Sequence, residues 1–139
     1  MKPLLLGLFL AGSLVLPIHA NAEDFKPSSN VVTLMPLLLD NLELLKVTPQ
    51  QLSEIRQISR KNFTEVEYIN AQYHNLKSEL KDELLDFTVD AKHSLKLAQE
   101  LAQLEQKRFQ LTINCANGLK NLLSASQYEE LIGLLEFQS

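Results

Sequence analysis

Cysteine, glycine and proline are scarce in this sequence, and tryptophan does not occur. Cys115 is the only cysteine, so no disulfide can form within one chain, and the fold must be held by packing, by association with other chains, or by both. After residue 22, the helix-breaking residues are reduced to a short set: Gly118, Gly133, Pro27, Pro36 and Pro49. A segment so poor in breakers and so rich in Leu, Glu, Gln, Lys and Ala predicts an all-α fold.

Basic residues are too few and too dispersed for a nucleic-acid-binding protein. The chain has 13 Lys and Arg against 17 Asp and Glu, a formal net charge of −4, and phosphate contacts require concentrated positive charge. Patterns typical of catalysis are missing as well, because there is no glycine-rich phosphate loop and no nucleophile beside a base. We therefore expect neither an enzyme nor a cofactor nor a nucleic-acid partner.

The N-terminal 22 residues have the pattern of a secretory signal peptide. Lys2 precedes an apolar run from Leu4 to Ile18, and Ala20-Asn21-Ala22 provides the small-x-small pattern that signal peptidase accepts. The run is short for a membrane span, which needs roughly 20 apolar residues, and Pro17 interrupts its end. The sequence predicts export, with cleavage after Ala22 (or, as the alternative, after Ala20) and no stable membrane insertion.

The remaining chain divides into a flexible lead-in, residues 23–33, and one helical domain, residues 34–139. Hydrophobic spacing predicts a short helix over 34–46 that is apolar on nearly every side, and a long helix over 49–86 with one apolar stripe. A third helix, capped by Asp86 or Thr88, is expected to end near Leu123, and a fourth to end near Phe137. The short connection between the two long helices predicts an antiparallel hairpin.

Two helix starts carry the same capping chemistry. Thr48 and Gln51 form one predicted capping box, with a proline at the first helical position, and Ser124 and Gln127 form a second. On the capping pattern alone, these four residues are interpreted as structural caps.

Val47-Thr48-Pro49-Gln50-Gln51 and Leu123-Ser124-Ala125-Ser126-Gln127 each resemble the Leu-Thr-x-x-Gln motif of the Spy/CpxP family of periplasmic proteins. That family has the motif before its long second helix and again before its last helix, as in this chain. Val47 stands in place of the first Leu and Ser124 in place of the second Thr. The resemblance covers about residues 34–137.

This resemblance implies a four-helix, cradle-shaped protomer that forms an antiparallel homodimer in the periplasm. Members of the family include ATP-independent chaperones for unfolded clients, an inhibitor of a sensor kinase, and metal-sensing or zinc-binding relatives. The expected function is therefore capture of unfolded proteins during envelope stress. A heavy-metal sensor or metal-binding protein is the first alternative, with a possible sensor-kinase or metal-response partner, and a structural coiled-coil assembly protein is the second.

Apolar residues in excess of one narrow helical seam are the candidates for client contact. Burial by the flanking helices, or by the partner in a dimer, is the alternative interpretation, because both kinds of surface look the same in sequence. The small core expected of a domain this size also favours a dimer. The candidate client-binding residues are Leu37, Leu38, Leu39, Leu44, Phe63, Ile69 and Tyr73.

Soft metal ligands in the helical domain are limited to His74, His93 and Cys115. Folding the hairpin about residues 87–88 places His74 near Leu101 and His93 near Asp82, with the two histidines on the order of 12 Å apart along the axis, too far to share an ion.

His93 with Asp82, Asp86 and Asp90 could bind a divalent ion loosely, but a solvated acidic turn is the favoured interpretation, so no metal site is predicted. Cys115 is interpreted as a small buried hydrophobe, with an intermolecular disulfide as the alternative.

Overall fold

The structure is a computed structural model that describes residues 27 and 30–137, and the described residues contain four helices and no strand. This confirms the all-α fold with a long hairpin. The predicted signal peptide and most of the lead-in lie outside the described residues. The helices are α1 (Leu34–Asp40), α2 (Pro49–Leu85), α3 (Ala91–Leu122) and α4 (Ala125–Phe137).

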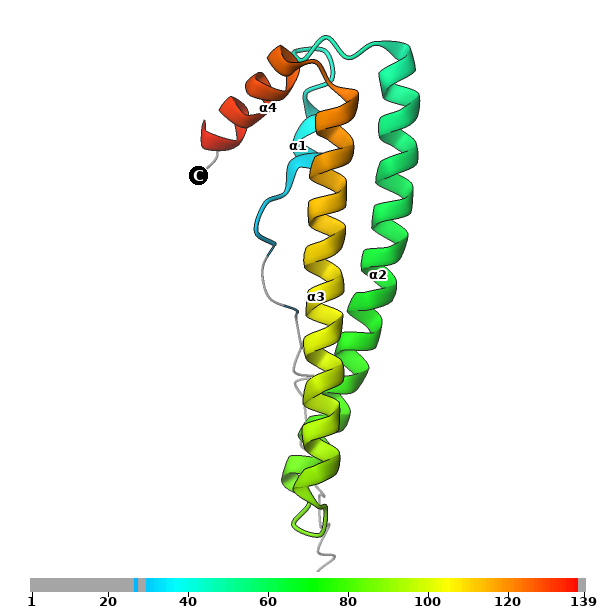
Figure 1. Cartoon of the computed structure of the whole chain (residues 1–139), viewed down its shortest axis with the longest axis vertical. Coiled ribbons are helices and arrows are strands. Elements are labelled where there is room, and N and C mark those ends of the chain that lie inside the picture. The colour runs from blue at the N-terminus through cyan, green and yellow to red at the C-terminus, as the bar shows by residue number, and fades with distance from the viewer. Residues whose placement is uncertain (1–26, 28–29, 138–139) are drawn as a thin grey trace, which may run out of the picture.

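Helices α2 and α3 form an antiparallel hairpin that makes up most of the molecule (Figure 1). With 37 residues, α2 extends about 55 Å at 1.5 Å per residue. The two helices meet along a seam of buried side chains, in which Ile69 and Tyr73 of α2 pack near Leu101 and Leu104 of α3. None of the described helices is both long enough and apolar enough to cross a membrane.

The turn between α2 and α3 differs from the sequence prediction. The carboxylate of Asp86 accepts hydrogen bonds from the backbone N–H of Thr88 (2.8 Å) and from its hydroxyl (2.7 Å), which closes a turn outside either helix. Asp90 then caps α3, with its carboxylate accepting from the N–H of Lys92 at 3.1 Å. The expected cap at Asp86 or Thr88 was therefore wrong, because both side chains bond to each other within the turn.

Helix α1 is also shorter than predicted, ending at Asp40 instead of continuing to residue 46. Asn41 ends it, donating from its side chain to the carbonyl of Leu37 at 2.8 Å. The chain then turns back through Lys46, whose φ of 51° lies in the left-handed region, and the N–H of Val47 bonds to the carbonyl of Leu42. These turns place Leu45 in the core, although propensity alone would continue the helix.

The core consists of two clusters along the hairpin. One is the middle seam described above, and the other lies at the open end, where α1 and α4 pack against each other and against the hairpin (Figure 1). Leu38 of α1, Leu119 of α3 and Leu131 of α4 are fully buried together there. The remaining buried members of this second cluster are Leu34, Leu37, Leu45, Ile55 and Leu123.

Candidate functional site

The two capping boxes anticipated from the sequence have matching geometry. The hydroxyl of Thr48 accepts from the N–H of Gln51 at 3.2 Å, while the side-chain oxygen of Gln51 accepts from the N–H of Thr48 at 3.0 Å. At the start of α4, Gln127 donates its N–H to the hydroxyl of Ser124 at 3.2 Å and accepts from the N–H of Ser124 at 2.9 Å. Each box satisfies two backbone donors that a helix start leaves without partners.

The two boxes also bond to each other, which the sequence did not reveal. The side-chain nitrogen of Gln51 donates to the side-chain oxygen of Gln127 at 2.9 Å, and the reverse bond from Gln127 to Gln51 measures 3.2 Å. Each nitrogen also donates to a backbone carbonyl just before the other box, Gln51 to Leu122 (3.1 Å) and Gln127 to Leu45 (3.0 Å). The two motifs thus form one roughly symmetric polar junction, which we call the glutamine lock: Thr48, Gln51, Ser124 and Gln127.

The glutamine lock joins the start of α2 to the start of α4. It therefore fixes the direction in which α4 leaves α3 and keeps the buried face of α4, with Leu131, over the open-end core. The four residues form hydrogen bonds among themselves and to the backbone, an arrangement that positions helices.

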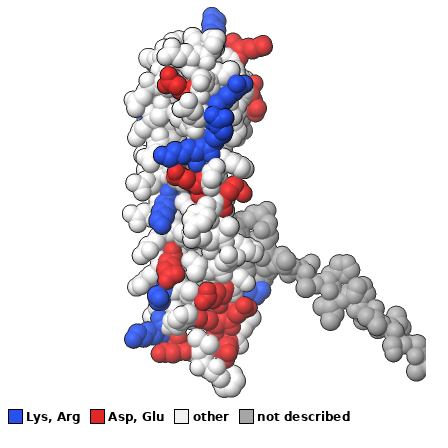
Figure 2. Space-filling view, turned by 90° about the vertical axis from the view of Figure 1, so that its right-hand side faces the viewer, with Lys and Arg blue, Asp and Glu red and all other residues white. Residues whose placement is uncertain are grey.

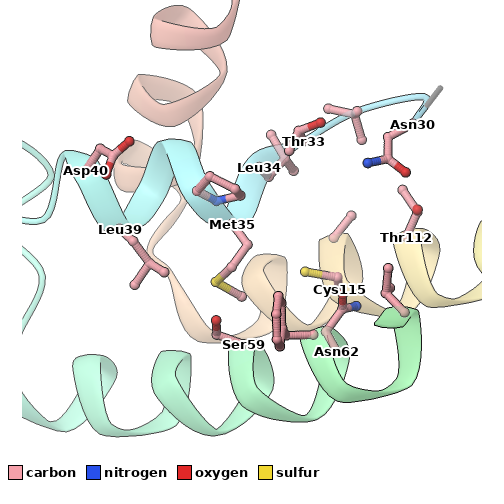
Figure 3. Close-up of a pocket in the computed structure, with 15 residues that line it drawn as sticks. Asn30, Thr33, Leu34, Met35, Leu39, Asp40, Ser59, Asn62, Thr112 and Cys115 are labelled. Carbon is pink, nitrogen blue, oxygen red and sulfur yellow. The ribbon is translucent and has the colours of Figure 1, made fainter. Parts of the chain in front are cut away.

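A cavity of ≈ 490 Å³ lies between α1 and the hairpin. Figure 3 shows Met35 and Leu39 reaching toward it from α1, opposite Asn62 of α2 and Cys115 of α3. Its lining is mainly apolar, and its size falls within the range of small-molecule and peptide side-chain pockets. The further lining residues are Asn30, Val32, Thr33, Leu34, Pro36, Asp40, Ser59, Phe63, Val66, Thr112 and Ala116.

Cys115 is half-buried in the wall of this cavity. Burial raises the pKa of its thiol above the ordinary value of 9.0, because desolvation disfavours the thiolate. The thiolate is the reactive form of cysteine, so this environment suits a packed thiol better than a nucleophile.

The candidate client-binding residues divide into two groups in the structure. Leu37 and Leu38 are buried in the open-end core, and Ile69 and Tyr73 are buried in the hairpin seam, so they are not accessible to a client in this conformation. The accessible members are Leu39, which lines the cavity, Leu44, and Phe63, which is 66% exposed. Sequence periodicity identified the apolar positions but could not tell which of them another helix covers.

An exposed apolar stripe on α3 was not separated from the core by sequence reasoning. The apolar positions of α3 divide into buried residues, which include Leu97, Leu101 and Leu104, and a second line of accessible residues. Leu95 (65% exposed) and Ile113 (59% exposed) are the first and last residues of this accessible line. We call this line the α3 stripe: Leu95, Ala98, Ala102, Phe109 and Ile113, which recur at helical spacings of three, four, seven and four.

His74 and His93 lie on different helices, α2 and α3. His93 contacts Glu83 through its Nδ1, one position from Asp82, which the predicted hairpin register placed beside it.

Among known proteins, no protein-family model, no curated protein and no solved structure matches this chain.

Proposed function

We propose that the chain is a periplasmic, ATP-independent chaperone of the Spy/CpxP kind, which captures unfolded proteins on apolar side chains of its helical hairpin. The observation that carries the proposal is the large amount of apolar surface left accessible on an otherwise polar hairpin. Phe63 of α2 is 66% exposed, and it lines the mainly apolar cavity together with Leu39 and Val66. Contiguous apolar surface on a small protein marks a site of interaction with other proteins.

The mechanism follows from the mixture of charge and apolar surface. Charged residues on both long helices attract unfolded segments at long range, and accessible apolar side chains then hold them without requiring one particular sequence. The absence of a nucleotide-binding loop from the sequence is consistent with release by simple dissociation.

We also propose that the working form is an antiparallel homodimer. Charge is distributed unevenly along the hairpin: residues 76–100, at the tip, include six acidic and four basic residues, whereas the rest of α2 and α3 includes four acidic and six basic residues. Figure 2 shows acidic side chains at the lower end of the molecule, where the hairpin turns, with basic side chains among them and further acidic side chains at the upper end. An antiparallel pair would set each acidic tip against the basic part of its partner, and the α3 stripe would supply apolar contact.

An aggregation assay tests the chaperone proposal. The purified protein should slow the aggregation of a chemically unfolded client at near-stoichiometric ratios without ATP. Phe63→Ser should weaken this activity, whereas Tyr68→Ser should not, since Tyr68 has nearly the same exposure (65%) on the same helix but points about 140° away around it. No protection by the wild-type protein, or equal effects of the two substitutions, would contradict the proposed function.

Sedimentation equilibrium tests the dimer separately. The expected mass is twice that of one chain, and Ile113→Lys should shift it toward one chain by placing a charge in the α3 stripe. A wild-type mass equal to one chain at micromolar concentration would exclude the dimer. The chaperone proposal would then depend on the aggregation assay alone.

A further inference from the structure

The tip of the hairpin brings together three side chains with metal-binding chemistry. Glu79 and Glu83 lie one turn apart on α2, and His93 lies in the first turn of α3. One potential ligand atom from each of the three residues lies within 4.8 Å of those of the other two. Among the described residues, Glu79, Glu83 and His93 form the group of three His, Cys or acidic residues whose potential ligand atoms come this close together.

The carboxylate of Glu83 is held in place by contacts to both of its oxygens. His93 Nδ1 contacts one oxygen of Glu83, and the hydroxyl of Ser94 donates to the other oxygen at 2.9 Å. The Glu83 side chain is only 13% exposed, whereas Glu79 and His93 are accessible from solvent. A hydrogen bond from a neighbouring residue to a ligating carboxylate is a common way of orienting it toward a metal.

The helix packing below the tip fixes the relative positions of the three residues. Leu97, one turn after His93, is buried, and Leu80, between the two glutamates, packs against the middle core cluster. The ligands therefore come from two helices with a set register and would need only small side-chain movements to meet at one point.

Electrostatics favours a cation at this point. Two carboxylates at positions i and i+4 of one helix repel each other, and Glu83 is largely shielded from water. A divalent cation bound between them would neutralise both charges, and the imidazole would add a nitrogen ligand. One nitrogen and two carboxylate oxygens suit zinc and neighbouring divalent transition metals, with water completing the coordination.

We propose that Glu79, Glu83 and His93 bind one divalent transition-metal ion of the zinc class at the tip of the hairpin. This site shares His93 with the loose group considered from sequence but uses Glu79 and Glu83 as the carboxylates, because the potential ligand atoms of these three residues lie within 4.8 Å of one another. It lies at the opposite end of the hairpin from the cavity, so it does not depend on the chaperone proposal.

Calorimetric titration of zinc into the tag-free, reduced protein tests the site. The expected result is one zinc ion per chain, with at least about tenfold weaker binding in His93→Gln and in Glu79→Gln, which are exposed residues whose replacement leaves the core intact. His74→Gln is the matched control, since this second histidine lies on α2 outside the cluster and its loss should leave the zinc affinity unchanged. Cobalt(II) should give visible absorption bands in the wild type that are lost in His93→Gln.

Several outcomes would overturn the proposal. They are the absence of zinc binding at millimolar concentration, an unchanged isotherm in His93→Gln, and a loss of binding in Cys115→Ser that exceeds the loss in His93→Gln. Circular dichroism of each variant establishes that the helices are intact. Client protection measured on His93→Gln should match the wild type, which separates failure of the metal site from failure of the proposed function.

Discussion

Gln51 and Gln127, separated by 76 positions in the sequence, exchange hydrogen bonds in both directions between their side-chain amides. Each glutamine also completes its own helix cap, so one amide group serves a local and a tertiary purpose at once. This coupling links the start of α2 to the start of α4 and gives the paired motifs a shared structural role.

Replacing Gln127 with glutamate should keep the helix cap of α4 but remove the hydrogen bonds that Gln127 donates to the start of α2. Glutamate serves as well as glutamine in a capping box, so a purely local cap would tolerate the change. A carboxylate cannot donate to Gln51 or to the carbonyls of Leu45 and Lys46, and it would face these acceptors instead. We expect Gln127→Glu to lower the free energy of unfolding by about 2 kcal/mol in urea denaturation at pH 7 and fixed protein concentration.

Gln106→Glu, at an exposed position of α3, is the control and should change stability by less than about 0.5 kcal/mol. A double-mutant cycle of Gln51→Ala and Gln127→Ala should give a coupling energy of about 0.5 to 3 kcal/mol. Additive effects of the two alanine substitutions, or a neutral Gln127→Glu, would show that the caps act independently.

The sequence could predict the helices and both caps because those features depend on neighbouring residues. Thr48 and Gln51 are three positions apart, and a capping box needs nothing more distant. The contact between the two boxes depends on how α4 packs, which no local pattern encodes. The end of α1 was mispredicted for a similar reason, because burial of Leu45 and the turn at Lys46 override the helix propensity of a leucine-rich segment.

The candidate client-binding surface was predicted only in part, because the sequence does not show which apolar side chains another helix covers. An apolar residue in an amphipathic helix is equally recognisable whether its partner is another helix of the same chain, a second copy or a client. The sequence therefore placed Tyr73, now in the hairpin seam, in one set with Phe63, which is accessible. Likewise, the Glu83–His93 contact depends on the hairpin register, and the predicted register placed His93 beside Asp82, one position from its observed partner.

Gly133 offers a stabilising substitution. It lies inside α4, and a Cβ added there would meet no atom within 4 Å. Because glycine costs a helix interior roughly 0.5 to 1 kcal/mol relative to alanine, Gly133→Ala should raise the free energy of unfolding by about that amount.

Gly118→Ala provides the comparison, since its Cβ would come within 3.3 Å of Ile58 Cδ1 across the hairpin. The gain in helix propensity there is offset by crowding, and we expect a smaller gain than at Gly133. Thermal unfolding of both variants at equal concentration measures the difference. A larger stabilisation from Gly118→Ala than from Gly133→Ala would contradict this account.

The hairpin turn should contribute a pH-dependent stability through Asp86. Hydrogen bonds from the hydroxyl and then from the backbone N–H of Thr88 lower the pKa of this carboxyl below its ordinary value of 3.8. A carboxyl with a lowered pKa stabilises the folded state above the unfolded value, and this contribution is lost as the pH falls through the folded value. Asp86→Asn should therefore reduce stability at pH 5 to 7, with the difference from the wild type shrinking in strong acid.

Thr88→Val removes the larger of the two causes and should raise the pKa of Asp86 toward 3.8. An NMR titration of the Asp86 carboxyl carbon in the wild type and in Thr88→Val measures this change directly. Identical titration midpoints in the two proteins would remove Thr88 as the cause.

Cys115 should react slowly with alkylating reagents in the folded protein. Its thiol lies half-buried in the cavity wall, and desolvation raises its pKa above 9.0, so less thiolate is present at pH 8 than for a free cysteine. The rate of iodoacetamide modification, followed by mass spectrometry, should be about tenfold lower than in the same chain unfolded in urea at the same pH. The folded-state rate should continue to rise above pH 9, since the thiolate fraction still increases there. Equal rates in the folded and unfolded chains would instead identify an accessible, ordinary thiol and would favour a disulfide between two copies.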